Sequence, residues 1–142
     1  MGIFLGDNMR KDTITKVTSK TAQDCRRNDL AGKTIVIYEN DRKHCYNRHY
    51  KDFKNPKTFA FIMNNLDYII NEHDFVLYNS KNSSLEYYKK LEDNITVRVK
   101  VENSNELKIK TVFAIPDEKY EMKKTRSIYN KYIIQEEELV TN

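Results

Sequence analysis

The sequence predicts an α+β fold, with helices packed on one face of a small antiparallel β-sheet, an N-terminal arm and a C-terminal helix. Three patterns in its 142 residues support this prediction. Apolar residues recur at three- and four-residue spacing over 59–70, which is typical of one face of a helix. Apolar and polar residues then alternate over 95–115, which is typical of strands. Pro116 ends that alternation before a charged segment with helical character.

The first half of the chain is predicted to be mainly helical. Residues 1–32 are polar, of mixed charge and weakly helical, and they form the predicted arm; residues 33–142 form a single domain. The β-branched and aromatic run 34–38 predicts a strand. The strongly basic segment 41–53 predicts a short helix.

A longer helix is predicted over 56–70. Asn55 and Pro56 supply an N-cap and a proline at the first helical position. Its apolar face consists of Phe59, Ile62, Met63, Leu66, Ile69 and Ile70. The remaining elements are four strands and a helix that ends in an acidic tail, at 75–78, 84–88, 95–101, 107–115 and 117–134.

Composition and charge exclude several classes of protein. Only 3 glycines and 2 prolines occur, which excludes collagen-like, glycine-linker and proline-rich sequences. Apolar runs are only a few residues long, so we expect no membrane span. Cys25 and Cys45 cannot form a disulfide framework, so the fold does not depend on an oxidising compartment. The net charge of +4 permits a polyanionic partner without requiring one.

Burial predicts the register of the last two strands. Each buried apolar side chain contributes about 1.5–3 kcal/mol, whereas an exposed charge pair contributes a fraction of that. The predicted facing pairs are Val101 with Leu107, Val99 with Ile109, Val97 with Thr111 and Ile95 with Phe113 on one face, and Lys100 with Lys108 and Arg98 with Lys110 on the other. We therefore expect an exposed basic face that a polyanion would stabilise; the alternative is a solvated lysine-rich surface that prevents aggregation.

Two histidines, His44 and His49, lie in the basic segment among Arg42, Lys43, Arg48 and Lys51. Imidazoles exchange protons near neutral pH, and cationic side chains bind phosphate and stabilise negative charge on it. Two imidazoles and a cation suffice to cleave RNA without a metal. Positions five apart on a helix diverge by about 140°, so the two rings would converge only if the helix ends or kinks between them. The alternative is a surface helix with incidental histidines.

Metal binding is a competing interpretation of the same segment. Cys45 and His49 have the four-residue spacing of ligands on a helix, but no second Cys/His pair follows, and a closed zinc site needs four ligands. We therefore expect neither a metal nor another cofactor. His73, at the end of the long predicted helix, is interpreted as a cationic partner of the helix dipole.

Several segments, taken in order, resemble a known nuclease family. The stretch 43–49, Lys-His-Cys-Tyr-Asn-Arg-His, resembles the basic H-x-x-x-x-H helix of the phage-associated members of the barnase–EndoU–colicin–RelE nuclease superfamily. Residues 82–90 are similar to the Tyr/Lys strand of that family, and residues 95–99 and 110–113 are similar to its last two strands. The resemblance covers residues 34–126.

The resemblance implies a helical layer on one face of the sheet and RNA, such as tRNA or mRNA, on the other. It implies a metal-independent, cytoplasmic endoribonuclease of toxin or phage-conflict type, with a cognate antitoxin or immunity protein. The implied catalytic residues are His44, His49 and Thr111. Substrate contacts are expected from Lys43, Arg48, Tyr88, Lys90, Arg98, Lys100, Lys108 and Lys110.

The predicted register conflicts with this resemblance at Thr111, because it places that side chain on the apolar face. Thr111 then lies either at a sheet end where the helical layer opens or in the core with its hydroxyl satisfied. Two other functions fit the same features. One is a non-catalytic RNA- or DNA-binding module that uses the basic face and its tyrosines for stacking. The other is a phage protein that engages a host protein through the arm and the acidic tail.

Overall fold

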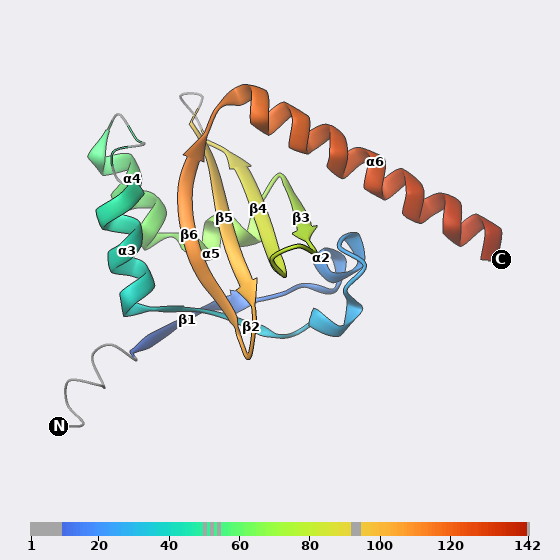
Figure 1. Ribbon diagram of the computed structural model, residues 1–142, viewed down its shortest axis with the longest axis horizontal. Helices are drawn as coiled ribbons and strands as arrows, with labels where there is room; N and C mark the ends of the chain where they lie inside the picture. The colour runs from blue at the N-terminus through green and yellow to red at the C-terminus, as the bar shows by residue number, and fades with distance from the viewer. Residues whose placement is uncertain (1–9, 50, 52, 54, 92–94, 142) are drawn as a thin grey trace.

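The computed structural model describes residues 10–49, 51, 53, 55–91 and 95–141. Within them the elements are β1 (Lys11–Lys16), α2 (Ser19–Asp24), the short 3-10 helix η1 (Asn28–Leu30), β2 (Thr34–Tyr38), α3 (Glu39–His49), α4 (Pro56–Asn64), α5 (Leu66–Asn71), β3 (Phe75–Asn79), β4 (Ser84–Lys90), β5 (Thr96–Asn103), β6 (Leu107–Ile115) and α6 (Asp117–Thr141). One sheet with flanking helices confirms the predicted α+β class (Figure 1). None of the described helices is long and apolar enough to cross a membrane.

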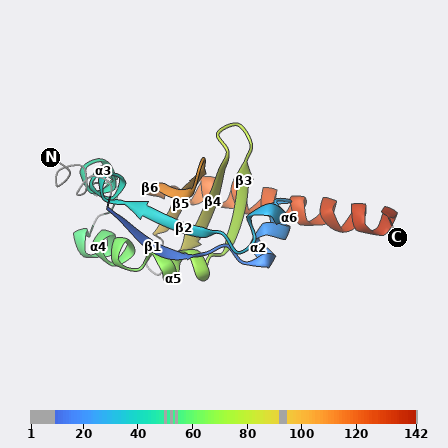
Figure 2. The ribbon, with the colours of Figure 1, turned by 90° about the horizontal axis from the view of Figure 1, so that it is seen from below.

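The described strands form a single sheet in the order β1-β2-β6-β5-β4-β3. β2 and β6 run parallel, and the other neighbours run antiparallel. Helix α5 lies behind the sheet in Figure 1 and α4 lies to its left, and both lie below the sheet in Figure 2. We call the side under these helices the helical face, defined by Val97 and Val99, and the opposite side the open face, defined by Glu86, Arg98 and Lys100.

The predicted helix over 56–70 is helical but breaks at Asn65 into α4 and α5. Asn65 has φ −132° and ψ 38°, and its Nδ2 donates a hydrogen bond to the Phe61 carbonyl at 2.8 Å. Such local side-chain bonds compete with continuation of a helix. The predicted cap is confirmed, since Asn55 Oδ1 accepts from the Lys57 amide at 2.9 Å. The apolar face is buried as predicted, at Phe59, Ile62, Met63, Leu66, Ile69 and Ile70.

Strand β1 lies within residues 1–32, where the sequence predicts only a weakly helical arm. It pairs antiparallel with β2 along the edge of the sheet. Ile14 is its single aliphatic residue, and none of its side chains is buried. A charged, polar edge strand carries no apolar alternation to detect. Helices α2 and η1 supply the helical part of this segment.

The register of the β5–β6 hairpin differs from the predicted one. Val101 pairs with Ile109 instead of Leu107, because β5 continues to Asn103 and residues 104–106 alone form the turn. A shift of two residues keeps every side chain on its face. The apolar pattern therefore fits both registers equally, and the length of the turn decides between them.

Glu106 fixes this turn against the beginning of the sheet. Its carboxylate accepts a hydrogen bond from Lys11 Nζ at 2.8 Å and another from the Tyr38 hydroxyl. These partners lower the pKa of Glu106, Lys11 most strongly. The turn is thus held by β1 and β2, which are far away in sequence.

A β-bulge at Lys110 shifts the register by one further residue. Lys100 pairs with Thr111, so Lys110 is the extra residue in β6. Beyond the bulge the alternation is reversed: Val112 joins the core on the helical face, whereas Thr111 and Phe113 lie on the open face. The prediction that Thr111 and Phe113 share the apolar face is therefore wrong, and the conflict over Thr111 is removed.

The predicted like-charge pairs do not form. Lys108 lies opposite Glu102, Lys100 opposite Thr111, and Arg98 opposite Phe113. The turn and the bulge together replace two repulsive pairs with one attractive pair and one cation–aromatic contact.

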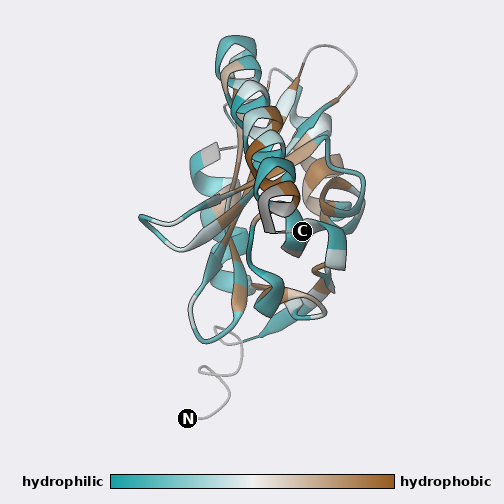
Figure 3. Ribbon diagram, turned by 90° about the vertical axis from the view of Figure 1, so that its right-hand side faces the viewer, coloured by the Kyte–Doolittle hydropathy of each residue, from teal (hydrophilic) through white to brown (hydrophobic). Residues whose placement is uncertain are grey.

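Helix α6 is longer than the predicted 117–134 and continues through the acidic tail to Thr141. It begins at the β3 edge of the sheet, where Tyr120 is buried with its ring centroid 5.3 Å from that of Phe75. Near its end, Arg26 Nη2 lies 2.7 Å from Glu137 Oε2. Figure 3, which faces the end of the helix, shows polar and apolar residues mixed around it.

Candidate active site

Two rows of side chains cross the open face from β4 to β6. One row consists of Glu86, Lys100 and Thr111, and the next consists of Tyr88, Arg98 and Phe113. Neighbouring strands lie about 4.8 Å apart, so each row spans about 10 Å. A carboxylate, two cations and two hydroxyls therefore gather on one side of the sheet.

Glu86 is the acidic member of this group, and only 6% of its surface is exposed. The Tyr88 hydroxyl donates a hydrogen bond to Glu86 Oε1 at 3.2 Å. Burial raises the pKa of Tyr88 to about 12, so this hydroxyl keeps its proton at neutral pH and remains a donor. Tyr88 is itself completely buried, so it positions its neighbours and does not stack on a base. The carboxylate is thus fixed and sheltered from bulk water, as suits a general base.

Arg98 is the central cation of the open face. Its Cζ lies 4.2 Å from the centroid of the Phe113 ring, and its Nη1 donates to the Tyr88 hydroxyl at 3.4 Å. Its Nε is buried without a hydrogen-bond partner among the described residues. A buried donor without a partner costs about 1–3 kcal/mol. Arg98 as a whole is only half-buried, so the accessible part of its cation can bind an anion. Lys100, in the neighbouring row, makes no ion pair within the described part of the chain.

Helix α3 follows β2 and lies along the second half of β6. Lys110 Nζ is 3.3 Å from Asp41 Oδ1, and the buried Cys45 directs its Sγ at the Lys110 carbonyl, 4.0 Å away. Another flank of α3 faces α4, where the rings of Tyr46 and Phe59 lie 5.0 Å apart. One side of α3 therefore faces β6 and another faces α4. The next side around the helix from β6, away from α4, borders the open face.

Helical geometry places His44 on that flank. Each residue turns about 100°, so position 44 lies about 60° from Asp41 and about 160° from Tyr46. His44 is exposed there, and Arg48 follows one turn later. Position 49 belongs to the same uninterrupted helix, about 140° around from position 44; the His49 side chain lies outside the described part of the structure. The two predicted acid/base positions therefore do not share a flank.

The other predicted substrate contacts are dispersed. Lys108 lies on the open face, whereas Lys90 and Lys110 are engaged by carboxylates; Lys90 Nζ is 3.9 Å from Asp117 Oδ1. Lys43 is exposed on α3. It lies about 160° around the helix from the buried Cys45, so it is on the side of α3 that faces away from the sheet. The predicted residues that the open face brings together are Tyr88, Arg98, Lys100, Lys108 and Thr111.

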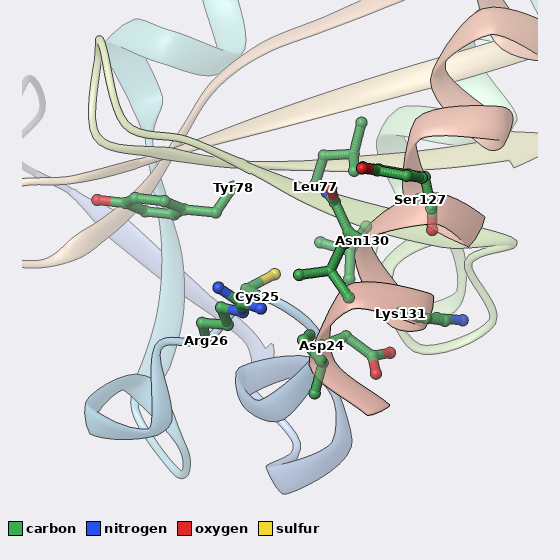
Figure 4. A pocket seen from close by; sticks show the side chains of 12 residues that line it. Asp24, Cys25, Arg26, Leu77, Tyr78, Ser127, Asn130 and Lys131 are labelled. Carbon is green, nitrogen blue, oxygen red and sulfur yellow. The ribbon is translucent and has the colours of Figure 1, made fainter. Parts of the chain in front are cut away.

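A separate cavity of about 340 Å³ lies between the end of α2, β3 and α6 (Figure 4). Cys25 lines it, and burial raises the pKa of this thiol to about 12. Burial also raises the pKa of Cys45, to about 11. A nucleophilic thiol needs a lowered pKa, so neither cysteine is activated. Among the described residues, no three His, Cys, Asp or Glu side chains are grouped to hold a metal ion.

Glu86 is the site residue that the sequence pattern does not single out. Between Leu85 and Tyr87 it is an ordinary outward-facing polar residue of an alternating strand. Its significance depends on the pairing of β4 with β5, which places it opposite Lys100 and diagonal to Arg98. The available signal is a carboxylate two residues before Tyr88, in a strand to which the family resemblance assigns substrate contacts.

A family model matches residues 12–122 of the chain, and its description is phage-Barnase-EndoU-ColicinE5/D-RelE like nuclease3. The match runs from β1 into the beginning of α6, so it includes the open face and α3. No curated protein and no solved structure matches the chain. The family match covers well over half of the sequence, and the chain belongs to this nuclease family.

Proposed function

We propose that this nuclease is a metal-independent endoribonuclease that cleaves RNA on the open face. One observation carries the proposal: the sheltered carboxylate of Glu86 shares that face with Arg98, whose buried Nε has no partner among the described residues. A proton acceptor beside a cation that makes no ion pair with any described residue suits attack by a hydroxyl on a phosphate group.

In the proposed reaction, Glu86 removes the proton from a 2′-hydroxyl, whose oxygen then forms a bond to the adjacent phosphorus. Arg98 and Lys100 bind the phosphate oxygens and stabilise the developing charge, and Thr111 donates a hydrogen bond to the same group. Protonated His44 gives its proton to the 5′-oxygen as the bond from that oxygen to phosphorus breaks. The products carry a 2′,3′-cyclic phosphate and a 5′-hydroxyl.

The pair of histidines is an alternative assignment within the same reaction. In that version His49, and not Glu86, accepts the proton of the 2′-hydroxyl. The two versions differ in one variant: Glu86→Gln abolishes the general base in the first and leaves it intact in the second. A His49→Ala variant gives the reciprocal result.

We further propose a cellular RNA such as tRNA or mRNA as the substrate, in the cytoplasm of a host or target cell. Membership of a phage-associated nuclease family supports a toxin or conflict role. A nuclease of that kind needs a neutralising antitoxin or immunity protein in the cell that produces it.

Incubation with total RNA in EDTA, followed by analysis of the fragment ends, tests the proposed reaction. We expect cleavage without divalent metal and fragments that end in a 2′,3′-cyclic phosphate. The control is a Glu86→Gln/Arg98→Ala variant purified in the same way, which reveals any contaminating ribonuclease. Cleavage that stops in EDTA and returns with zinc or magnesium would contradict the mechanism.

A non-catalytic nucleic-acid-binding role is the second candidate, and one surface favours it. A groove of about 580 Å³ beside α4, α5 and the end of β4 carries Phe61 and Tyr68, which are 48% and 45% exposed. Lys57 and Lys89 line the same groove. Exposed aromatic rings beside lysines bind single strands by stacking and charge. Binding without cleavage, lost on Phe61→Ala, would favour this role.

A further inference from the structure

A groove of about 800 Å³ lies between α6 and the β3–β4 hairpin. The hairpin contributes Asn79, Lys81 and Glu86 to its lining, and α6 contributes Lys123, Arg126 and Tyr129. The family match ends at residue 122. The α6 side of the groove therefore belongs largely to a part of the chain that the family model does not cover.

The groove is continuous with the open face. Glu86 belongs to both, because it lines the groove and also stands in the row with Lys100 and Thr111. Leu77, its partner on β3, lines the groove as well. A chain bound at Glu86 on the open face can therefore continue toward α6 without crossing a ridge of the sheet.

The lining of the groove carries an excess of positive charge, with three cations and the single carboxylate of Glu86. Lys81, Lys123 and Arg126 make no ion pair within the described residues. Three cations around one hollow favour a ligand with several negative charges.

The groove also offers a surface for a base. Tyr129 is 61% exposed on its rim. Aromatic rings beside cations bind single strands, because each base can stack on a ring while its phosphates meet the positive charges. An acidic protein would match the charge too, but a solvent-exposed ring flanked by several cations fits the alternation of bases and phosphates along a single strand.

We propose that this groove binds the single-stranded RNA that flanks the cleaved phosphate, and that the enzyme therefore acts on extended single strands. The proposal rests on the proposed cleavage at the open face. Lys81, Lys123 and Arg126 bind successive phosphates, and Tyr129 stacks on a base between them. Lys81, Lys123, Arg126 and Tyr129 contribute to the binding of long substrates and have no part in the chemical step, which rests on Glu86 at the inner end of the groove.

Binding of non-cleavable 2′-O-methyl RNA tests the groove separately from catalysis. The probes are a dinucleotide and a labelled single strand of about ten nucleotides, within the range that single-strand sites cover. The test variant is Lys81→Ala/Lys123→Ala/Arg126→Ala. The control is Lys20→Ala/Lys33→Ala/Lys124→Ala, which removes the same charge from exposed positions outside the groove. Thermal unfolding verifies that both variants are folded.

We expect the test variant to bind the long probe at least about tenfold more weakly and the dinucleotide unchanged. The slope of log K against log salt should fall by about 2, since each lost phosphate contact on a single strand removes about 0.7. Equal losses in the test and control variants, or equal losses for both probes, would overturn the proposal. An unchanged affinity for the long probe would overturn it too and leave the groove to an acidic protein.

Cleavage assays on the same proteins separate this proposal from the one on which it rests. We expect the test variant to show a raised KM on long RNA with an unchanged kcat. A parent protein that binds the long probe through the groove but cleaves no RNA would refute the proposed catalysis and leave the groove standing. A test variant that cleaves long RNA with the parent's KM would refute the groove alone.

Discussion

The two faces of the sheet are built on different principles. On the helical face, Val97, Val99 and Val101 are completely buried, and their positions follow from a strict alternation in the sequence. On the open face, Glu86 is buried and Arg98 is half-buried, and both are held by contacts with the Tyr88 hydroxyl. Apolar burial determines the first arrangement, whereas polar contacts within β4 and between β4 and β5 determine the second. The proposed chemistry lies on the face where apolar burial does not dictate the residue.

We expect the largest effect from substitutions on and beside the open face, which should lower the rate of RNA cleavage. Glu86→Gln keeps the shape of the side chain but removes the proton acceptor, and His44→Ala removes the proton donor. Each should lower the rate of RNA cleavage by about 10²- to 10⁴-fold, measured under single-turnover conditions. The parent rate should show a bell-shaped pH profile, because the carboxylate must be ionised while the imidazole is protonated. Glu102→Gln, a carboxylate on the same face opposite Lys108, is the matched control and should retain the parent rate.

Substitutions on the helical face should instead lower the free energy of unfolding. Ile109→Ala leaves a cavity beneath the helices and should lower the free energy of unfolding by about 2–5 kcal/mol. Lys100→Ala on the open face should change it by about 0.5 kcal/mol or less. Urea unfolding of both variants measures the difference. Equal losses of stability would show that the two faces are not divided in this way.

The bulge at Lys110 can be tested with two substitutions beyond it, one on each face of the sheet. Thr111→Val should lower turnover by about 10- to 100-fold, as expected for a lost hydrogen bond to a charged group, with little change in stability. Val112→Thr should instead lower stability by about 1–3 kcal/mol, because it buries a hydroxyl on the helical face. A loss of stability for Thr111→Val and a loss of turnover for Val112→Thr would instead support a strand without the bulge, in which Thr111 lies on the apolar face.

The smallest effect concerns His73, at the end of α5. Its Nδ1 lies 2.6 Å from the Ile70 carbonyl oxygen. Burial lowers the pKa of the ring. The Ile70 carbonyl, Asp24 and Asp74 partly oppose this lowering of the pKa, and Lys131 adds to it. The unfolded chain therefore binds the proton more readily, so the stability from a neutral His73 is present above about pH 6.5. It is lost as the pH falls from there toward the lowered pKa. Urea unfolding between pH 5 and pH 8, with His73→Gln as the comparison, should show a steeper acid loss in the parent.

The fold was largely predictable because burial leaves a periodic trace in the sequence. The alternation around Val99 and the helical spacing around Ile62 both report which residues meet the core. Strand β1 leaves no such trace, because its polar side chains face solvent at an edge. The hairpin register escaped prediction for a different reason: Glu106 sets the turn through contacts with Lys11 and Tyr38, which no local pattern contains.

The candidate site was predictable only in part. The basic residues Arg98 and Lys100 could be assigned to one face from alternation alone. Thr111 could not, because a single bulge reverses the alternation beyond Lys110. Glu86 became meaningful only once β4 was paired with β5. The role of such residues depends on pairing between strands, so the alternation within a single strand does not predict it.

The most direct test of this division is to map where RNA binds. Amide chemical shifts of the isotope-labelled protein should be followed during titration with a non-cleavable 2′-O-methyl single strand. We predict that the largest changes fall on the open face and the adjoining flank of α3, around Glu86, Arg98, Lys100, Thr111 and His44. Changes confined to the groove beside α4 and α5, around Lys57, Phe61, Tyr68 and Lys89, would contradict the assignment of function to the open face.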